Sequence, residues 1–155
     1  MRIEYLADHH SHIESVAAWQ QAEFGYLNPS LGLEQRVARL FASLSKTQLP
    51  VVLLALSEDK QALGSASIVA SSMIGRPQLG PWLSSVVVPP AHRGKGVASA
   101  LSLHAKHVAA SLGFRTLALF TPHSQSLYAR LGWHALEQST LGDLPVTIMS
   151  VDLDA

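Results

Sequence analysis

The sequence contains no cysteine at all, which limits its chemistry from the start. Without thiols the chain has no disulfide, no cysteine nucleophile and no cysteine-bound zinc. Charge is also sparse: charged residues make up 14% of the 155 positions, and eleven basic residues balance eleven acidic ones. This lack of a basic excess argues against a surface that binds nucleic acid or an anionic membrane.

Long apolar runs are missing as well. The first ten residues, MRIEYLADHH, hold no apolar core of signal-peptide length, and the longest aliphatic run spans only residues 51–56. A membrane-spanning helix needs about 20 apolar residues, so we expect a cytoplasmic protein without a membrane segment. What the chain does have is 48% hydrophobic residues, enough for the core of one domain over residues 1–155.

The spacing of the apolar residues predicts a mixture of strands and helices. Strands are predicted where apolar residues alternate or run on, over residues 2–6, 51–56, 62–70, 82–88, 117–120, 133–138 and 146–153. Helices are predicted where apolar residues recur every three or four positions, over residues 11–24, 33–44, 97–112 and 125–131. Residues 71–81, with two glycines and two prolines, are predicted to form an irregular loop.

Two patterns near the N-terminus give more specific expectations. Ser11 and Glu14 have the spacing of a capping box, so the first helix is expected to begin there. In the second helix the charged side chains are expected to point away from the core. These outward residues are Glu34, Arg36, Arg39 and Lys46.

The most informative stretch covers residues 82–101 and reads WLSSVVVPPAHRGKGVASAL. A predicted strand leads through two prolines into a turn that contains Gly94 and Gly96, and a helix follows. The first N–H groups of a helix have no partner inside it, and glycines let a ligand approach the backbone closely. Arg93 and Lys95 add positive charge. We interpret the turn as a phosphate site; a tight turn with solvated basic residues is the alternative.

Two common phosphate-binding patterns fit this turn poorly. A nucleotide-triphosphate loop needs Ser or Thr after its Gly-Lys pair, whereas Lys95 is followed by Gly96. A dinucleotide fingerprint needs a third glycine or an alanine where Ser99 stands. It also needs a carboxylate about 20 residues later, and residues 113–116 contain none.

The turn instead matches the signature of the GCN5-related N-acetyltransferases (GNATs), which is arginine or glutamine-x-x-glycine-x-glycine or alanine. Here it reads Arg93-x-x-Gly96-x-Ala98. A second segment, LYARLGW over residues 127–133, is similar to the leucine-tyrosine-x-x-x-glycine-aromatic segment with which GNATs close. Both motifs stand in the family's order over the second half of the chain, so the protein resembles a small GNAT domain.

The resemblance implies a fold and a cosubstrate. GNAT domains are α/β (α+β) proteins with a central mixed, mostly antiparallel sheet that is splayed after the fourth strand and flanked by helices. Acetyl-CoA binds in the opening. Pro89 and Pro90 lack the N–H groups that sheet pairing needs, so we expect the fourth strand to part from its neighbour after Val88. The cofactor-binding residues implied by the resemblance are Val86, Val87, Val88, Arg93, Gly94, Lys95, Gly96, Val97, Ala98 and Ser99.

The resemblance also implies a catalytic residue. It places the general acid at Tyr128, because a phenol with a pKa of about 10 can protonate the departing coenzyme A thiolate. A tyrosine that only packs at a helix end is the alternative. Many GNATs carry a glutamate base on the fourth strand, but here that strand offers only Ser84 and Ser85. The base stays open between a water molecule, Glu23, His92 and His123.

The acceptor side is expected near the end of the first helix, because the first two helices form much of the acceptor wall in GNATs. Trp19 and Glu23 are the candidates there, since an acid beside aromatics suits a cationic amine. Trp82 is a third candidate. Core aromatics with one solvated glutamate are the alternative. Small amines, amino acids and peptide N-termini all remain open as acceptors.

Several histidines raise the question of a metal. His9, His10 and His12 cluster near the N-terminus, and His104 and His107 share a predicted helix face. No carboxylate has ligand spacing to them, so we expect no metal.

The function expected from these observations is acetyl-CoA-dependent N-acetylation of a primary amine by direct attack in a ternary complex. No cysteine is present to carry an acetyl group. The alternative is a catalytically weak module that binds acetyl-CoA and senses or regulates. A homodimer stays open.

Overall fold

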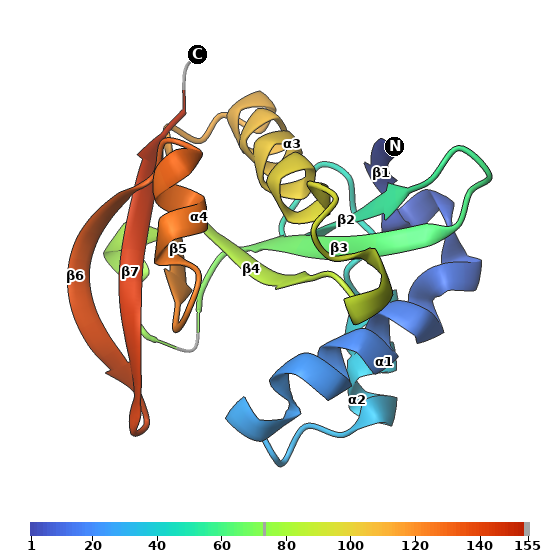
Figure 1. Cartoon of the computed structure of the whole chain (residues 1–155), viewed down its shortest axis with the longest axis horizontal. Coiled ribbons are helices and arrows are strands. Elements are labelled where there is room, and N and C mark those ends of the chain that lie inside the picture. Colours follow the sequence, from blue (N-terminus) through green and yellow to red (C-terminus); the bar gives the residue numbers. More distant parts are fainter. Residues whose placement is uncertain (73, 154–155) are drawn as a thin grey trace.

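Seven strands form one mixed sheet in the order β1-β2-β3-β4-β5-β7-β6 (Figure 1). The computed structural model describes residues 1–72 and 74–153. Met73 of the predicted loop and the last two residues of the predicted domain lie outside the described residues. All neighbouring strands pair antiparallel except β4 and β5, which are parallel. The strands are β1 (Arg2–Tyr5), β2 (Val51–Leu56), β3 (Ala62–Val69), β4 (Trp82–Val87), β5 (Thr116–Thr121), β6 (His134–Leu141) and β7 (Leu144–Asp152).

Helices cover both faces of this sheet (Figure 1). They are α1 (Ile13–Phe24), α2 (Leu33–Phe41), α3 (Val97–Ser111) and α4 (Gln125–Arg130). Along β2, Val52 and Leu54 pack with α1 and α2, whereas Val51 and Leu53 pack with α3. All six residues of β2 are therefore buried, as expected for a strand with both faces covered. The predicted element order and the mixed α/β class are confirmed.

The sheet opens between β4 and β5. These two strands pair only at Trp82 and Ala118, close to where β4 begins. The predicted splay is thus confirmed, but its expected position after Val88 is wrong, because β4 leaves β5 as soon as Leu83. The two prolines lie beyond the strand and do not cause the separation. β5 instead pairs along its whole length with β7, and β4 stays paired with β3 through a bulge at Ser85 (below).

The first two helices differ most from the prediction. Ser11 lies in a short 3-10 turn before α1, and no side chain caps the helix, so the capping box is not formed. α2 ends at Phe41, and both Leu33 and Phe41 are exposed. Arg36, expected outside, is only 6% exposed. Arg36 and Leu40, one turn apart, form the buried face of α2. The helix therefore packs on a different face from the one that its apolar residues predict.

The described helices are all too short or too polar to cross a lipid bilayer. The longest, α3, has 15 residues and ends before Gly113, whose φ of 93° places it in the left-handed region. The last two strands form a hairpin closed by Gly142 and Asp143, as expected, although both strands reach further toward this turn than predicted.

Candidate active site

The glycine turn before α3 is open on its outer side. Gly94 and Gly96 have φ values of 76° and 80°, in the left-handed region. A Cβ added at either glycine would meet no atom within 4 Å among the described residues. Gly96 is the N-cap of α3, and no described side chain caps this helix start. The first N–H groups of α3 are therefore free to receive an anion, and the fit that a diphosphate needs is present.

Arg93 ties the turn to two other elements. Its Nε donates to the carbonyl oxygen of Val88 at 2.8 Å, and its Nη2 donates to Oε2 of Glu23 at 3.2 Å. Part of this guanidinium is thus used within the protein rather than left for phosphate. Lys95 is exposed, and it borders a separate shallow hollow beside Glu58 and Asp59.

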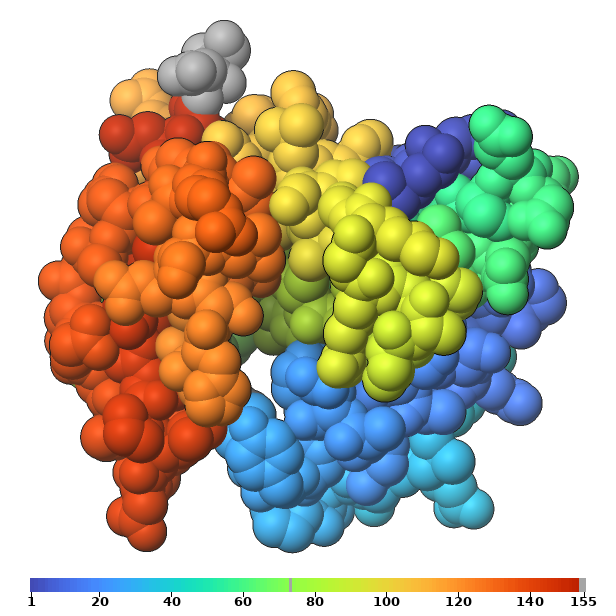
Figure 2. Space-filling model, in the orientation of Figure 1, coloured from blue at the N-terminus to red at the C-terminus, as the bar shows by residue number. Residues whose placement is uncertain are grey.

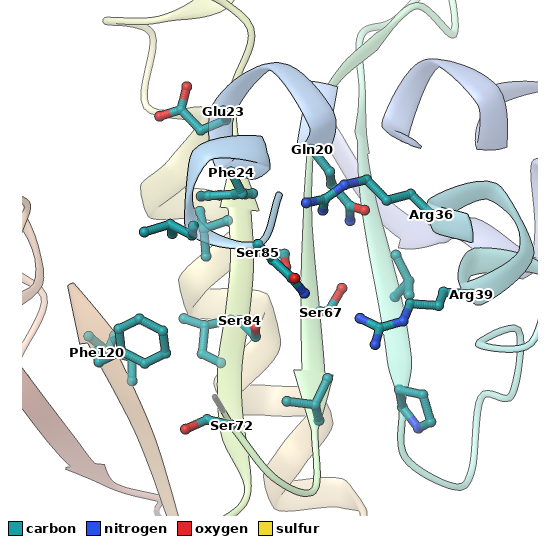
Figure 3. Close-up of a pocket in the computed structure, with 18 of the residues that line it drawn as sticks. Gln20, Glu23, Phe24, Arg36, Arg39, Ser67, Ser72, Ser84, Ser85 and Phe120 are labelled. Carbon is teal, nitrogen blue, oxygen red and sulfur yellow. The ribbon is translucent and has the colours of Figure 1, made fainter. Parts of the chain in front are cut away.

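A cavity of about 720 Å³ lies between the α1–α2 side of the sheet and the β5–α4 connection. Figure 2 shows the molecule hollowed between the orange C-terminal elements and the yellow-green segment before α3. The cavity is bordered by side chains of α1, α2, β2, β3, β4, β5 and α4. The polar ones that Figure 3 labels are Gln20, Glu23, Arg36, Arg39, Ser67, Ser72, Ser84 and Ser85. Thr121, His123, Ser124 and Tyr128 also border the cavity.

A β-bulge in β4 shapes the floor of this cavity. Ser84 is in register with Ser67 and Val87 with Ser65, so Ser85 and Val86 together oppose Ala66. Ser85 has a φ of 53°, which is unusual for a residue with a Cβ. As a result Ser84, Ser85 and Val86 all border the cavity, although side chains in a regular strand alternate between faces. Sequence reasoning missed this bulge, since no glycine marks it.

The three valines expected to contact the cofactor are not equivalent. Val86 borders the cavity, and Val88 follows the end of β4. Val87 is buried and in register with Ser65 of β3. Beside this pair, a Cβ on Gly64 would lie 2.9 Å from the carbonyl oxygen of Val87, so the close approach of β3 to the end of β4 requires glycine. The edge of β4 that faces β5 has no strand partner beyond Trp82 in the described part of the sheet.

Tyr128 borders the cavity from α4 and is only 6% exposed. Its ring lies edge-on to Trp133, with 5.9 Å between the ring centroids. Burial raises the pKa of the Tyr128 phenol above its usual value, and a hydrogen bond with the Ser102 side chain opposes the shift. A raised pKa keeps the phenol protonated, which is the form that donates a proton.

This raised pKa gives a prediction for alkaline titration. Ionisation of Tyr128 can be followed as the difference in ultraviolet absorbance between the wild type and Tyr128→Phe. We expect this difference to develop only above pH 10, because the ordinary pKa of tyrosine is about 10. Above that pH the unfolded chain loses this proton while the folded protein keeps it. The contribution of the protonated phenol to the free energy of unfolding is therefore complete below pH 10. It falls as the pH rises through the pKa of Tyr128 in the folded protein. A difference signal that is complete by pH 10 would contradict the buried, protonated phenol.

Only one of the three acceptor-side candidates lies at the cavity. Glu23 borders the cavity. Trp19 is half-buried and packs with the core under α1, and Trp82 is fully buried, edge-on to Phe120; neither borders the cavity. The residues that sequence reasoning missed are Arg36 and Arg39, because their helical positions favoured a solvated face. Of the candidate bases, Glu23 and His123 border the cavity and His92 does not.

Two of the histidines considered as metal ligands have defined surroundings. Nε2 of His9 lies 2.6 Å from Oε1 of Glu4, and this hydrogen bond lowers the pKa of that carboxyl group. Burial, with a smaller effect of His107, lowers the pKa of His104. Residues 1–72 and 74–153 bring no three potential metal ligands together.

Comparisons with solved structures agree with this fold. An aminoglycoside 6'-N-acetyltransferase complexed with coenzyme A superposes with a TM-score of 0.76 at 14% identity, covering 100% of this chain and 98% of that one. A GNAT superfamily phosphinothricin acetyltransferase from Sinorhizobium meliloti in complex with acetyl-CoA gives 0.76 at 18% identity, covering 98% and 88%. A putative acetyltransferase from Salmonella typhimurium with its cofactor acetyl-CoA gives 0.72 at 22% identity, covering 100% and 95%.

Sequence comparison addresses the family directly. The model of the acetyltransferase (GNAT) family matches residues 9–133. A search of curated proteins gives no match. The matched range contains the splayed strand β4, the open glycine turn and Tyr128. Because this family model matches well over half of the sequence, the chain belongs to the GNAT acetyltransferase family.

Proposed function

We propose that this protein is an acetyl-CoA-dependent N-acetyltransferase, formed as one domain over residues 1–155. It would transfer an acetyl group to a primary amine by direct attack in a ternary complex. One observation carries the proposal: the unpaired edge of β4 leads to a free helix start on one side and to the Tyr128 cavity on the other.

The residues around the opening fit the parts of acetyl-CoA. The N–H groups of Gly94, Gly96, Val97 and Ala98 would hold the pyrophosphate, with Lys95 and the Ser99 hydroxyl as neighbouring donors. Arg93 would act mainly by fixing the turn, since it already bonds Val88 and Glu23. The backbone of residues 86–88 would hold the pantetheine arm and polarise the thioester carbonyl. The bound cosubstrate supplies the activated acetyl group.

The proton transfers are assigned to side chains that border the cavity. Tyr128 would donate its phenolic proton to the departing sulfur, because burial keeps this group protonated. An acceptor amine is mostly protonated at neutral pH, so a base has to remove a proton before attack. Glu23 and His123 both border the cavity and are the proposed bases, directly or through water.

The proposal also covers the partners and the location of the protein. A small amine or a peptide N-terminus is the proposed acceptor, with no metal and no role for nucleic acid or membrane, and the cytoplasm is the proposed location. The exposed residues of β6 at one edge of the sheet leave room for a homodimer.

Acetyl-CoA binding followed by turnover separates the enzyme from a sensor. We expect acetyl-CoA to bind in calorimetry, and thiol release to appear with at least one member of a panel of amines. The panel includes an aminoglycoside and phosphinothricin, which the names of two structural neighbours suggest. Binding without thiol release from any amine would favour the weak, regulatory module. No binding at all would contradict the proposal.

A further inference from the structure

Arg36 is a buried cation without an acidic partner. Arg36 is only 6% exposed, and it borders the cavity. Its Nε donates to Oε1 of Gln21 at 2.9 Å. Within residues 1–72 and 74–153 no carboxylate lies at ion-pair distance from this guanidinium, and its terminal nitrogens donate to no protein atom. A buried charge of this kind is costly unless something pairs with it.

A second cation stands next to the first. Arg39 follows Arg36 by three residues, so both side chains project from the same side of α2. Figure 3 shows both side chains extending from α2 over the sheet, with the guanidinium group of Arg39 toward Ser67. Burial and, to a lesser degree, the charge of Arg39 lower the pKa of Arg36. Two arginines that repel each other in a cavity make a binding position for an anion.

The rest of this end of the cavity is neutral and rich in hydrogen-bonding groups. Gln20 and Ser67 are buried polar residues there, and Ser84 and Ser85 border it from β4. The acidic group of the cavity is Glu23, which is held by Arg93 beside the glycine turn. The cavity thus has a positive end at α2 and a carboxylate toward the cosubstrate side. A molecule with an amine at one end and an anionic group at the other matches this arrangement.

A purely structural role explains the geometry less well. The bond to Gln21 links α2 to α1, but it uses one of the five N–H donors of the arginine. A neutral apolar side chain would fill the same place without the cost of a buried charge. Both arginines border the cavity, and a carboxylate accepts from arginine through two parallel bonds.

We propose that Arg36 and Arg39 bind a carboxylate of the acceptor, so that the acceptor is an amino acid or a similar amine with an acid group. This inference rests on the proposed N-acetyltransferase function. It narrows the acceptors from all primary amines to those in which a carboxylate lies a few bonds from the amino group. Polycationic amines are excluded from this position by like charge.

The test compares amino acids with their own carboxamides, which have nearly the same shape but lack the negative charge of the acid group, at a pH high enough for both amines to be largely neutral. We expect thiol release from acetyl-CoA to show a kcat/KM for the best amino acid about 10–100-fold above that for its amide, the usual range for losing a charged hydrogen-bonded pair. Equal rates for acids and amides would overturn this inference and leave the proposed function standing. If no amine is acetylated, the proposed function fails and the inference fails with it.

Substitutions test whether the two arginines cause the preference for the amino acid over its amide. Arg36→Met and Arg39→Met are each expected to raise KM for the amino acid about tenfold or more, and so to reduce the preference for the acid over its amide. Arg115→Met, at an exposed arginine away from the cavity, is the matched control and should behave as wild type. If Arg36→Met does not fold, Arg39→Met carries the test, because Arg39 is exposed. An unchanged preference for the acid in a folded variant of either arginine would contradict its role.

Discussion

Gly96→Asp is expected to abolish acetyl-CoA binding and to leave the fold intact. The new carboxylate would stand at the N-cap of α3, where the diphosphate is proposed to sit. Two like charges about 4 Å apart repel by about 4 kcal/mol in a partly exposed site. We therefore expect calorimetry to show a Kd for acetyl-CoA raised by a factor of about 1,000.

Two controls separate charge from backbone strain in this experiment. Gly96→Asn keeps the shape of the aspartate without its charge, so it should weaken binding much less. Gly142→Asp introduces the same residue at another glycine with positive φ, in the β6–β7 turn. It should cost about 1–2 kcal/mol of unfolding free energy, as Gly96→Asp does, and leave binding unchanged. Wild-type affinity in Gly96→Asp would reject the phosphate cradle.

Tyr128→Phe is expected to lower kcat by a factor of about 100–10,000, the usual range for losing a general acid. The phenylalanine keeps the ring that packs against Trp133, so folding and acetyl-CoA affinity should stay close to wild type. Only the hydroxyl group, which the buried site keeps protonated, is lost. Steady-state kinetics with the best amine, together with calorimetry of acetyl-CoA binding, measures the two quantities separately.

The outcome of this substitution distinguishes catalysis from packing. If Tyr128 only packs, Tyr128→Phe turns over at the wild-type rate, and the proton then comes from water. Trp133→Phe provides a matched change on the other side of the same contact. It should lower the free energy of unfolding without a comparable loss of kcat, since Trp133 does not border the cavity.

Much of the fold could be predicted because its signals are local. The continuous apolar run from Val51 to Leu56 predicts a strand buried on both faces, which is what β2 is. Gly94 and Gly96 permit a turn with positive φ that residues with a Cβ rarely adopt. The strand, the turn and the start of α3 are adjacent in sequence. The cosubstrate side of the candidate site therefore follows from one continuous stretch.

The acceptor side could not be predicted because it depends on contacts between distant segments. Arg36 carries a charge that favours a solvated face, and only the packing of α2 against the sheet turns it into the cavity. Trp82 stands in a strand whose far face is covered by Phe120 and its neighbours, so it is buried and not at the site. The bulge at Ser85 has no glycine to mark it, and it changes which residues of β4 line the cavity.

The central claim is that the open edge of β4 and the free start of α3 bind acetyl-CoA together. Backbone amide resonances, followed by NMR while acetyl-CoA is added, test this claim most directly. We predict that the largest shifts fall on residues 86–88 and 94–99, with little change in β1 and β6. Saturable binding that shifts other residues and leaves both of these segments unchanged would contradict the account.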